Sequence, residues 1–124
     1  MLIVRFAAAP VAALALIAGP AAAGELYGDS FLGSPTHWTI DGTPLMSVPA
    51  KGTSAATVTG GAHSIDVTSD NGFRLIETIV LDESQLADVR GKQYWCVMIA
   101  TEGYRMFSVL LDREACQGLV EAAK

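Results

Sequence analysis

Residues 92–111, KQYWCVMIATEGYRMFSVLL, contain the pattern that decides the fold class. Two apolar segments, residues 92–101 and 104–111, flank the pair Glu102-Gly103, which is typical of a tight hairpin turn. Each segment is apolar at odd and even positions alike, and this is typical of a strand that is covered on both faces. We therefore expect a β-hairpin at the centre of a sheet, with further structure on each side of it.

The segment that follows this hairpin predicts a helix packed on the sheet. Asp112 is placed to cap a helix over residues 113–123. The apolar residues of that segment recur at helical spacing and form one stripe, which consists of Cys116, Leu119, Val120 and Ala123. An even number of cysteines in an oxidising compartment favours a disulfide. We therefore expect a bond between Cys96 and Cys116 that fixes the last helix to a central strand.

Upstream of the hairpin, the sequence predicts several shorter strands. Period-two alternation and β-branched residues indicate strands at His37–Ile40, 53–59, 63–68 and 73–81. Turn signals separate them at Asp41-Gly42, Gly60-Gly61 and Asp70-Asn71-Gly72. Prolines and glycines predict a loop over residues 44–52, and residues 24–35 read as an irregular arm or a weak edge segment.

A short helix is expected over residues 83–90. Asp82 is suited to the N-cap, and Gln85 can complete a capping box with it. The flanking residues agree with this helix, because Leu81 and Leu86 can form a hydrophobic staple and Gly91 provides a C-terminal stop. Together the elements predict one α+β domain, an antiparallel sheet of about five to six strands with the short helix and the C-terminal helix packed on one face.

The N-terminus has the pattern of an export signal. Arg5 is followed by an alanine-rich apolar run, a helix break at Pro20 and the small residues Ala21–Ala23. We predict a cleavable signal peptide over residues 1–23 and a single mature domain over residues 24–124, located in the periplasm or secreted and without stable membrane insertion after cleavage. The alternative is an uncleaved anchor, because the apolar run is just long enough to span a bilayer.

The charge pattern argues against nucleic-acid binding. Loss of Arg5 with the signal leaves seven of the eight basic residues and all thirteen acidic ones, so the mature net charge is near −6. The basic residues are scattered along the chain, whereas nucleic-acid binding needs a basic stripe to neutralise phosphates. Moderate acidity mainly serves solubility, and the alternative is an acidic face for a partner with a basic surface.

No catalytic, metal-binding or cofactor motif is evident in the sequence. A metal site that uses His37, His63 and nearby Asp41 or Asp66 would need the two strands that carry the histidines to be adjacent, and the spacing does not require this. Glu77 interrupts an apolar face and is expected as a buried carboxylate, or else at a bend of the sheet or as the partner of an arginine. We therefore predict no metal and no cofactor, and we assign no catalytic residue.

Three aromatic residues of the N-terminal part, Tyr27, Phe31 and Trp38, are the candidate partner-binding residues, because Trp and Tyr are frequent at binding hot spots. The alternative is that they cover the far face of the sheet. We interpret the domain as a protein-binding module for another exported protein, such as an inhibitor, accessory subunit or assembly factor. The second hypothesis is a small-ligand carrier or minor enzyme with a pocket between the N-terminal arm and the sheet.

Overall fold

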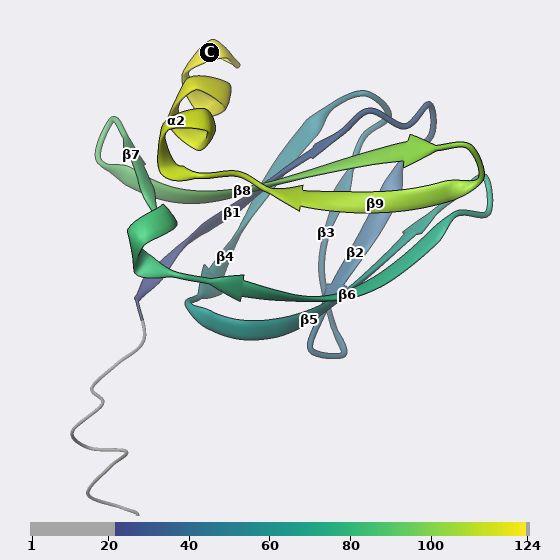
Figure 1. The fold of residues 1–124 in the computed structure, drawn as a ribbon, viewed down its shortest axis with the longest axis horizontal. Coiled ribbons are helices and arrows are strands. Elements are labelled where there is room, and N and C mark those ends of the chain that lie inside the picture. Colours follow the sequence, from purple (N-terminus) through teal and green to yellow (C-terminus); the bar gives the residue numbers. More distant parts are fainter. Residues whose placement is uncertain (1–21, 124) are drawn as a thin grey trace, which may run out of the picture.

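The computed structural model describes residues 22–123 and shows two sheets packed face to face with one helix outside them (Figure 1). The predicted signal peptide therefore lies almost wholly outside the described residues. The strands are β1 (Ala23–Ser30), β2 (Thr36–Ile40), β3 (Thr43–Val48), β4 (Thr53–Thr59), β5 (Gly61–Ser69), β6 (Arg74–Leu81), β7 (Ala87–Val89), β8 (Lys92–Glu102) and β9 (Arg105–Leu110), and the helix is α2 (Arg113–Ala122).

The first sheet, sheet A, has the order β4-β1-β8, and β7 and β9 both pair with the remaining edge of β8. The second sheet, sheet B, has the order β3-β2-β5-β6 and is antiparallel throughout. In sheet A, however, β1 and β8 are parallel. The prediction of one antiparallel sheet was therefore wrong. All of sheet B and β4 lie between β1 and β8 in the chain, which is ample length for a parallel connection.

The core lies between the two sheets. Its largest buried side chains come from both, and they include Trp38 and Ile65 of sheet B together with Leu26, Trp95 and Ile99 of sheet A. Because side chains alternate along a strand, β8 sends every second residue into this core and the others to the outer face. The two-faced apolar pattern of residues 92–101 thus has a simple cause: sheet B covers one face and α2 covers part of the other.

The N-terminal part is more regular than the sequence predicted. Residues 23–30 form β1, a central strand of sheet A and not an irregular arm, and β3 occupies most of the predicted loop at residues 44–52. Position 28 has no room for a side chain, because a Cβ atom there would lie 2.8 Å from Met46 Cε and 3.0 Å from the Trp38 ring. In β1, glycine therefore marks a close approach between the sheets.

The helix predicted over residues 83–90 is absent. Only one 3₁₀ turn, Glu83–Gln85, forms there, and the chain then enters β7. Arg90 and Gly91 have φ values of 55° and 85°, as in a tight hairpin turn, and this turn pairs β7 with β8. Residues 87–89, which were expected in the last helical turn, thus pair with β8 as a strand. The local signal was partly correct, because the Gln85 side chain accepts a hydrogen bond from the Asp82 N–H (3.4 Å).

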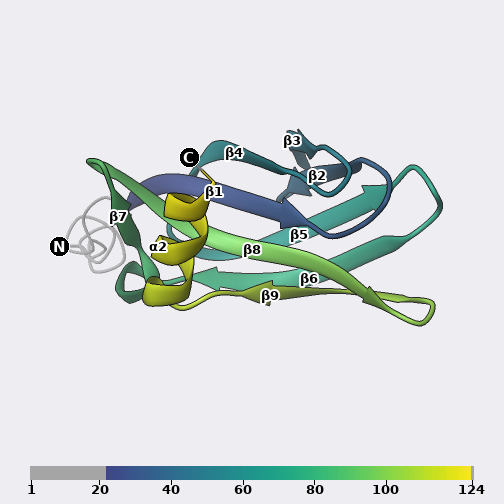
Figure 2. The ribbon, with the colours of Figure 1, turned by 90° about the horizontal axis from the view of Figure 1, so that it is seen from above.

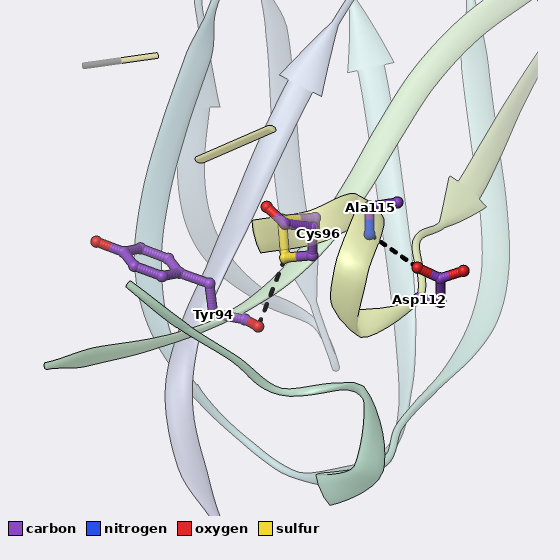
Figure 3. Close-up of a disulfide and its surroundings, with 5 residues drawn as sticks. Tyr94, Cys96, Asp112 and Ala115 are labelled. Carbon is purple, nitrogen blue, oxygen red and sulfur yellow. Dashed lines mark hydrogen bonds between the residues drawn. A yellow bond between two sulfur atoms is a disulfide. The ribbon is translucent and has the colours of Figure 1, made fainter. Parts of the chain in front are cut away.

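The C-terminal helix and the disulfide were predicted correctly. The Asp112 side chain accepts a hydrogen bond from the Ala115 N–H (2.8 Å), and Cys96 is bonded to Cys116 with a Cα–Cα distance of 5.3 Å (Figure 3). The residues buried between α2 and sheet A are Tyr27, Ala87, Val89, Tyr94 and Cys96 of the sheet and Cys116 and Val120 of the helix. This second apolar cluster is small, and the disulfide ties it directly to the central strand β8.

Candidate functional site

Helix α2 covers only one end of the outer face of sheet A. Figure 2 shows the helix above one end of β1 and β8, while the β8–β9 hairpin continues beyond it without a helix above it. Paired residues of neighbouring strands point to the same side of a sheet. The row that contains Tyr27 and Cys96 lies under the helix. The next rows of the same face lie beyond it.

Two rows of side chains in this uncovered area form what we call the open face, and the exposed pair Glu102 and Arg105 lies beyond them at the end of the hairpin. The first row contains Asp29 on β1, Met98 on β8 and Val109 on β9, and Thr53 of β4 continues it at the sheet edge. In the second row, Ala100 of β8 pairs with Phe107 of β9. Phe31 follows β1, continues its register with β8 through a hydrogen bond from its N–H to the Ile99 carbonyl (3.0 Å), and completes this row. The open face therefore consists of Asp29, Phe31, Met98, Ala100, Phe107 and Val109.

The open face is apolar and accessible. Phe31 is 56% exposed and Val109 is 44% exposed, and Met98, Ala100 and Phe107 are half-buried. Phe31 and Phe107 flank the small side chain of Ala100, so the second row has two aromatic rings separated by a shallow depression at Ala100. A contiguous apolar area of this kind is a candidate site of interaction with another molecule.

Asp29 is the charged residue of the open face. Burial raises the pKa of its carboxyl, and the hydrogen bond from the Ser30 N–H opposes this effect with a smaller lowering. The carboxylate is thus held in a partly apolar setting that disfavours its charge. A cation from a partner would stabilise the ionised form, because an opposite charge within a few ångströms favours ionisation.

The tip of the β8–β9 hairpin adds a further aromatic side chain. Tyr104 is fully exposed, and it follows Gly103, which has a φ of 64° in the turn. The hairpin extends away from α2 (Figure 1), so its tip lies beyond the second row of the open face. An exposed tyrosine there adds to the accessible aromatic surface at this end of the sheet.

The structure separates the three aromatic residues that the sequence nominated. Phe31 lies on the open face. Trp38 is 2% exposed in the core, where its Nε1–H donates to the Thr36 hydroxyl (2.8 Å), and Tyr27 is buried under α2 against Tyr94, with ring centroids 6.0 Å apart. Only Phe31 of the three presents a large area to solvent. Sequence reasoning missed the other open-face residues because it expected both faces of the 92–111 hairpin to be covered.

His63 links the turn between β2 and β3 to the end of β4 through two hydrogen bonds. Its Nδ1–H faces the Asp41 carboxylate (2.6 Å) and its Nε2–H faces the Thr59 carbonyl (2.7 Å). Burial lowers the pKa of His63, but these two acceptors outweigh it and the net shift is upward. The hydrogen bond from His63, with one from the Ser64 N–H, holds the pKa of Asp41 below its usual value. The pair lies beside a cleft of about 350 Å³ that is also lined by Ile40, Thr43, Thr57 and Val58.

The other candidate polar residues are engaged elsewhere. His37 contacts Asp70 (2.8 Å) and Ser47 (3.0 Å), and it lies towards the opposite end of the β2–β5 pair from His63. Asp66 forms an ion pair with Arg74 (2.8 Å). The structure therefore does not bring the two histidines and these carboxylates together. Within residues 22–123, no group of three or more potential ligands is arranged to hold a metal ion.

Glu77 is neither a buried carboxylate nor the partner of an arginine in the described residues. It is exposed, and its carboxylate accepts a hydrogen bond from the Ser108 hydroxyl. This contact joins β6 of sheet B to β9 of sheet A along one side of the sandwich. Glu77 therefore links the edges of the two sheets.

Comparisons with known proteins leave the function to be argued from this geometry. Neither the protein-family models nor the curated proteins searched contain a match to the chain. Among the described residues, the helical segments are too short and polar to cross a membrane.

Proposed function

We propose that this domain is a protein-binding module that docks on another exported protein through the open face. The observation that carries the proposal is the row Phe31–Ala100–Phe107, an accessible apolar strip built on three hydrogen-bonded strands. The strip lies on regular strands and is continuous with the disulfide-bonded cluster under α2. A partner would therefore meet a surface that is already ordered, which lowers the entropic cost of binding.

The shape of the surface favours a protein over a small ligand. Ligand sites are usually concave and enclose most of the ligand, whereas the open face is a sheet surface. The cleft at His63 lies between β4 and the β2–β3 turn, away from the open face, and both ring nitrogens of His63 are already engaged there. The carrier hypothesis therefore has less support than the docking hypothesis.

The charge on the module indicates the kind of partner. The complete chain has a formal net charge of −5, and Asp29 lies within the open face. We expect the partner to present aliphatic or aromatic side chains together with a lysine or arginine that meets Asp29. The disulfide is consistent with an oxidising compartment, so the partner is expected among exported proteins.

Site-specific photo-crosslinking in the producing cell tests this proposal. A photoreactive phenylalanine analogue at Phe31 or Phe107 should crosslink the domain to a defined protein, because both side chains point outward from the open face. The same analogue at Thr78, which is exposed on the outer face of sheet B, is the control. Mass spectrometry of the crosslinked band identifies the partner, and the size of the band separates a different protein from a second copy of this chain.

The proposal predicts one dominant adduct from the open-face positions and a much weaker one from Thr78. Equal adducts from all three positions would mean random collision. Absence of adducts at Phe31 and Phe107 would contradict docking through the open face.

A further inference from the structure

β4 is an edge strand of sheet A that lacks the usual protection against pairing. It pairs with β1 on one side and with no strand of residues 22–123 on the other. An exposed edge offers a row of backbone N–H and C=O groups to any strand that approaches. At one end of this edge the His63 ring bonds the Thr59 carbonyl beside a cleft, whereas Thr53, Ala55 and Thr57 are exposed.

The flanking hydrogen bonds identify which residues face the free edge. The Ser30 N–H donates to the Gly52 carbonyl (3.0 Å), and the Gly60 N–H donates to the Ala22 carbonyl (2.6 Å). In an antiparallel ladder the residues that bond to the partner alternate with residues that bond away from it. The even-numbered residues of this stretch therefore face β1. The residues whose backbone groups face the free edge are Thr53, Ala55, Thr57 and Thr59, and the Thr59 carbonyl already accepts a hydrogen bond from the His63 ring.

The other edge strands carry features that discourage pairing, and β4 does not. β3 contains Pro44 and pairs with β2 through a register shift, and β7 has only three residues. Charged residues lie on the remaining edges, Arg74 and Glu77 on β6 and Arg105 on β9. β4 has the sequence TSAATVT, without charge or proline, and its register with β1 is unbroken. Proteins normally protect such an edge, so its exposure has a use.

We infer that β4 pairs antiparallel with β4 of a second copy of this chain, with the twofold axis at Ala56. The strand is self-complementary in this register: Ala56 meets its own copy, Ala55 meets Thr57, and Thr53 meets Thr59. The Ala55–Thr57 pairs would form the central hydrogen bonds, while the Thr59 carbonyl keeps its bond to His63. No like charges are brought opposite each other within the strand. Just before β4, Lys51 comes level with Gly61 of the other copy, towards the end of the edge where His63 contacts Asp41.

This pairing gives one continuous sheet with a twofold axis perpendicular to it. The two open faces then lie on the same side of the dimer. A dimer could engage a partner at two sites, and its apparent affinity would rise through effective concentration. The inference does not depend on the proposed function, since the pairing uses the free backbone edge of β4, whereas docking uses outward side chains of β8, β9 and the end of β1.

Sedimentation velocity of the mature protein, from about 5 µM to about 500 µM, tests the pairing. An interface of one short strand is at the small end of protein interfaces, so we expect a weak monomer–dimer equilibrium within this range. Ala55→Pro removes an N–H that faces the free edge and leaves the bonds to β1 in place. Ala55→Lys places a charge on the same edge, and β4 can accommodate the longer side chain because Ala55 is exposed. Each should weaken dimerisation at least about tenfold, as edge protection does.

Two controls make the result specific. Thr78→Lys adds the same charge on the outer face of sheet B and should leave the equilibrium unchanged. Hydrogen exchange should slow at the Ala55 and Thr57 amides as the wild-type concentration rises. The inference is overturned if the protein stays monomeric throughout, or if Ala55→Lys dimerises like the wild type. It is also overturned if Phe31→Ser abolishes association, because the dimer would then use the open face.

Discussion

Trp38→Ala should destabilise the domain by about 3–5 kcal/mol, the range typical of a large aromatic residue removed from a packed core. Trp38 is 2% exposed, and its Nε1–H satisfies the hydroxyl of Thr36, which is fully buried. The substitution therefore creates a cavity and leaves a buried hydroxyl without its partner. Small domains have a total stability of about 5–15 kcal/mol, so much of the stability would be lost.

Urea denaturation followed by the fluorescence of Trp95 measures this loss. The matched control is Phe31→Ala, another aromatic truncation, which should change stability by less than about 1 kcal/mol because the side chain is largely exposed. A Trp38→Ala variant as stable as Phe31→Ala would show that Trp38 is not part of the core.

Removal of the Cys96–Cys116 bond should have the second largest effect. The disulfide closes a loop with a sequence separation of 20, and a loop of this length contributes about 3 kcal/mol. The bond also attaches α2 to β8, and few other apolar side chains of the helix are buried. We expect the reduced protein to unfold at a clearly lower urea concentration, with α2 amides exchanging first.

The oxidised and reduced wild-type proteins can be compared directly, with Cys96→Ala/Cys116→Ala as an independent reference for the missing bond. Coincident unfolding curves for the oxidised and reduced forms would contradict the account of α2. Loss of near-ultraviolet signal from Tyr27 and Tyr94 on reduction would support it, because these rings pack beneath the helix.

Features determined by neighbouring residues could be predicted from the sequence. The turn at Asp41-Gly42 and the strand at 53–59 were confirmed. The β8–β9 hairpin, the Asp112 cap and the disulfide were confirmed as well. Each of these depends on a turn residue, a cap or a period within about twenty residues.

Features determined by distant residues were missed. Residues 24–35 have no clear periodicity, yet residues 23–30 form a central strand because β4 and β8 supply partners from far along the chain. Residues 83–90 have good helix signals, but pairing of β7 with β8 outweighed them. Propensity is a weak prior that tertiary contacts override.

The candidate site was missed for the same reason. Phe31 was nominated from its type, but its neighbours on the open face come from strands about seventy residues away. Their proximity depends on the parallel pairing of β1 with β8, which no local pattern encodes. The sequence also gave no indication that α2 stops short of the second half of the sheet.

The central claim is that the open face binds a protein partner, and one comparison of affinities tests it most directly. Phe31→Ser and Ile76→Ser remove similarly exposed apolar side chains, 56% and 60% exposed, from the outer faces of sheet A and sheet B. Binding of the crosslinked partner, purified and titrated by calorimetry, should be weakened at least about tenfold by Phe31→Ser, as for a hot-spot residue. Ile76→Ser should bind like the wild type, and both variants should keep the wild-type melting temperature within a few degrees. Equal affinities for the two variants would contradict the claim.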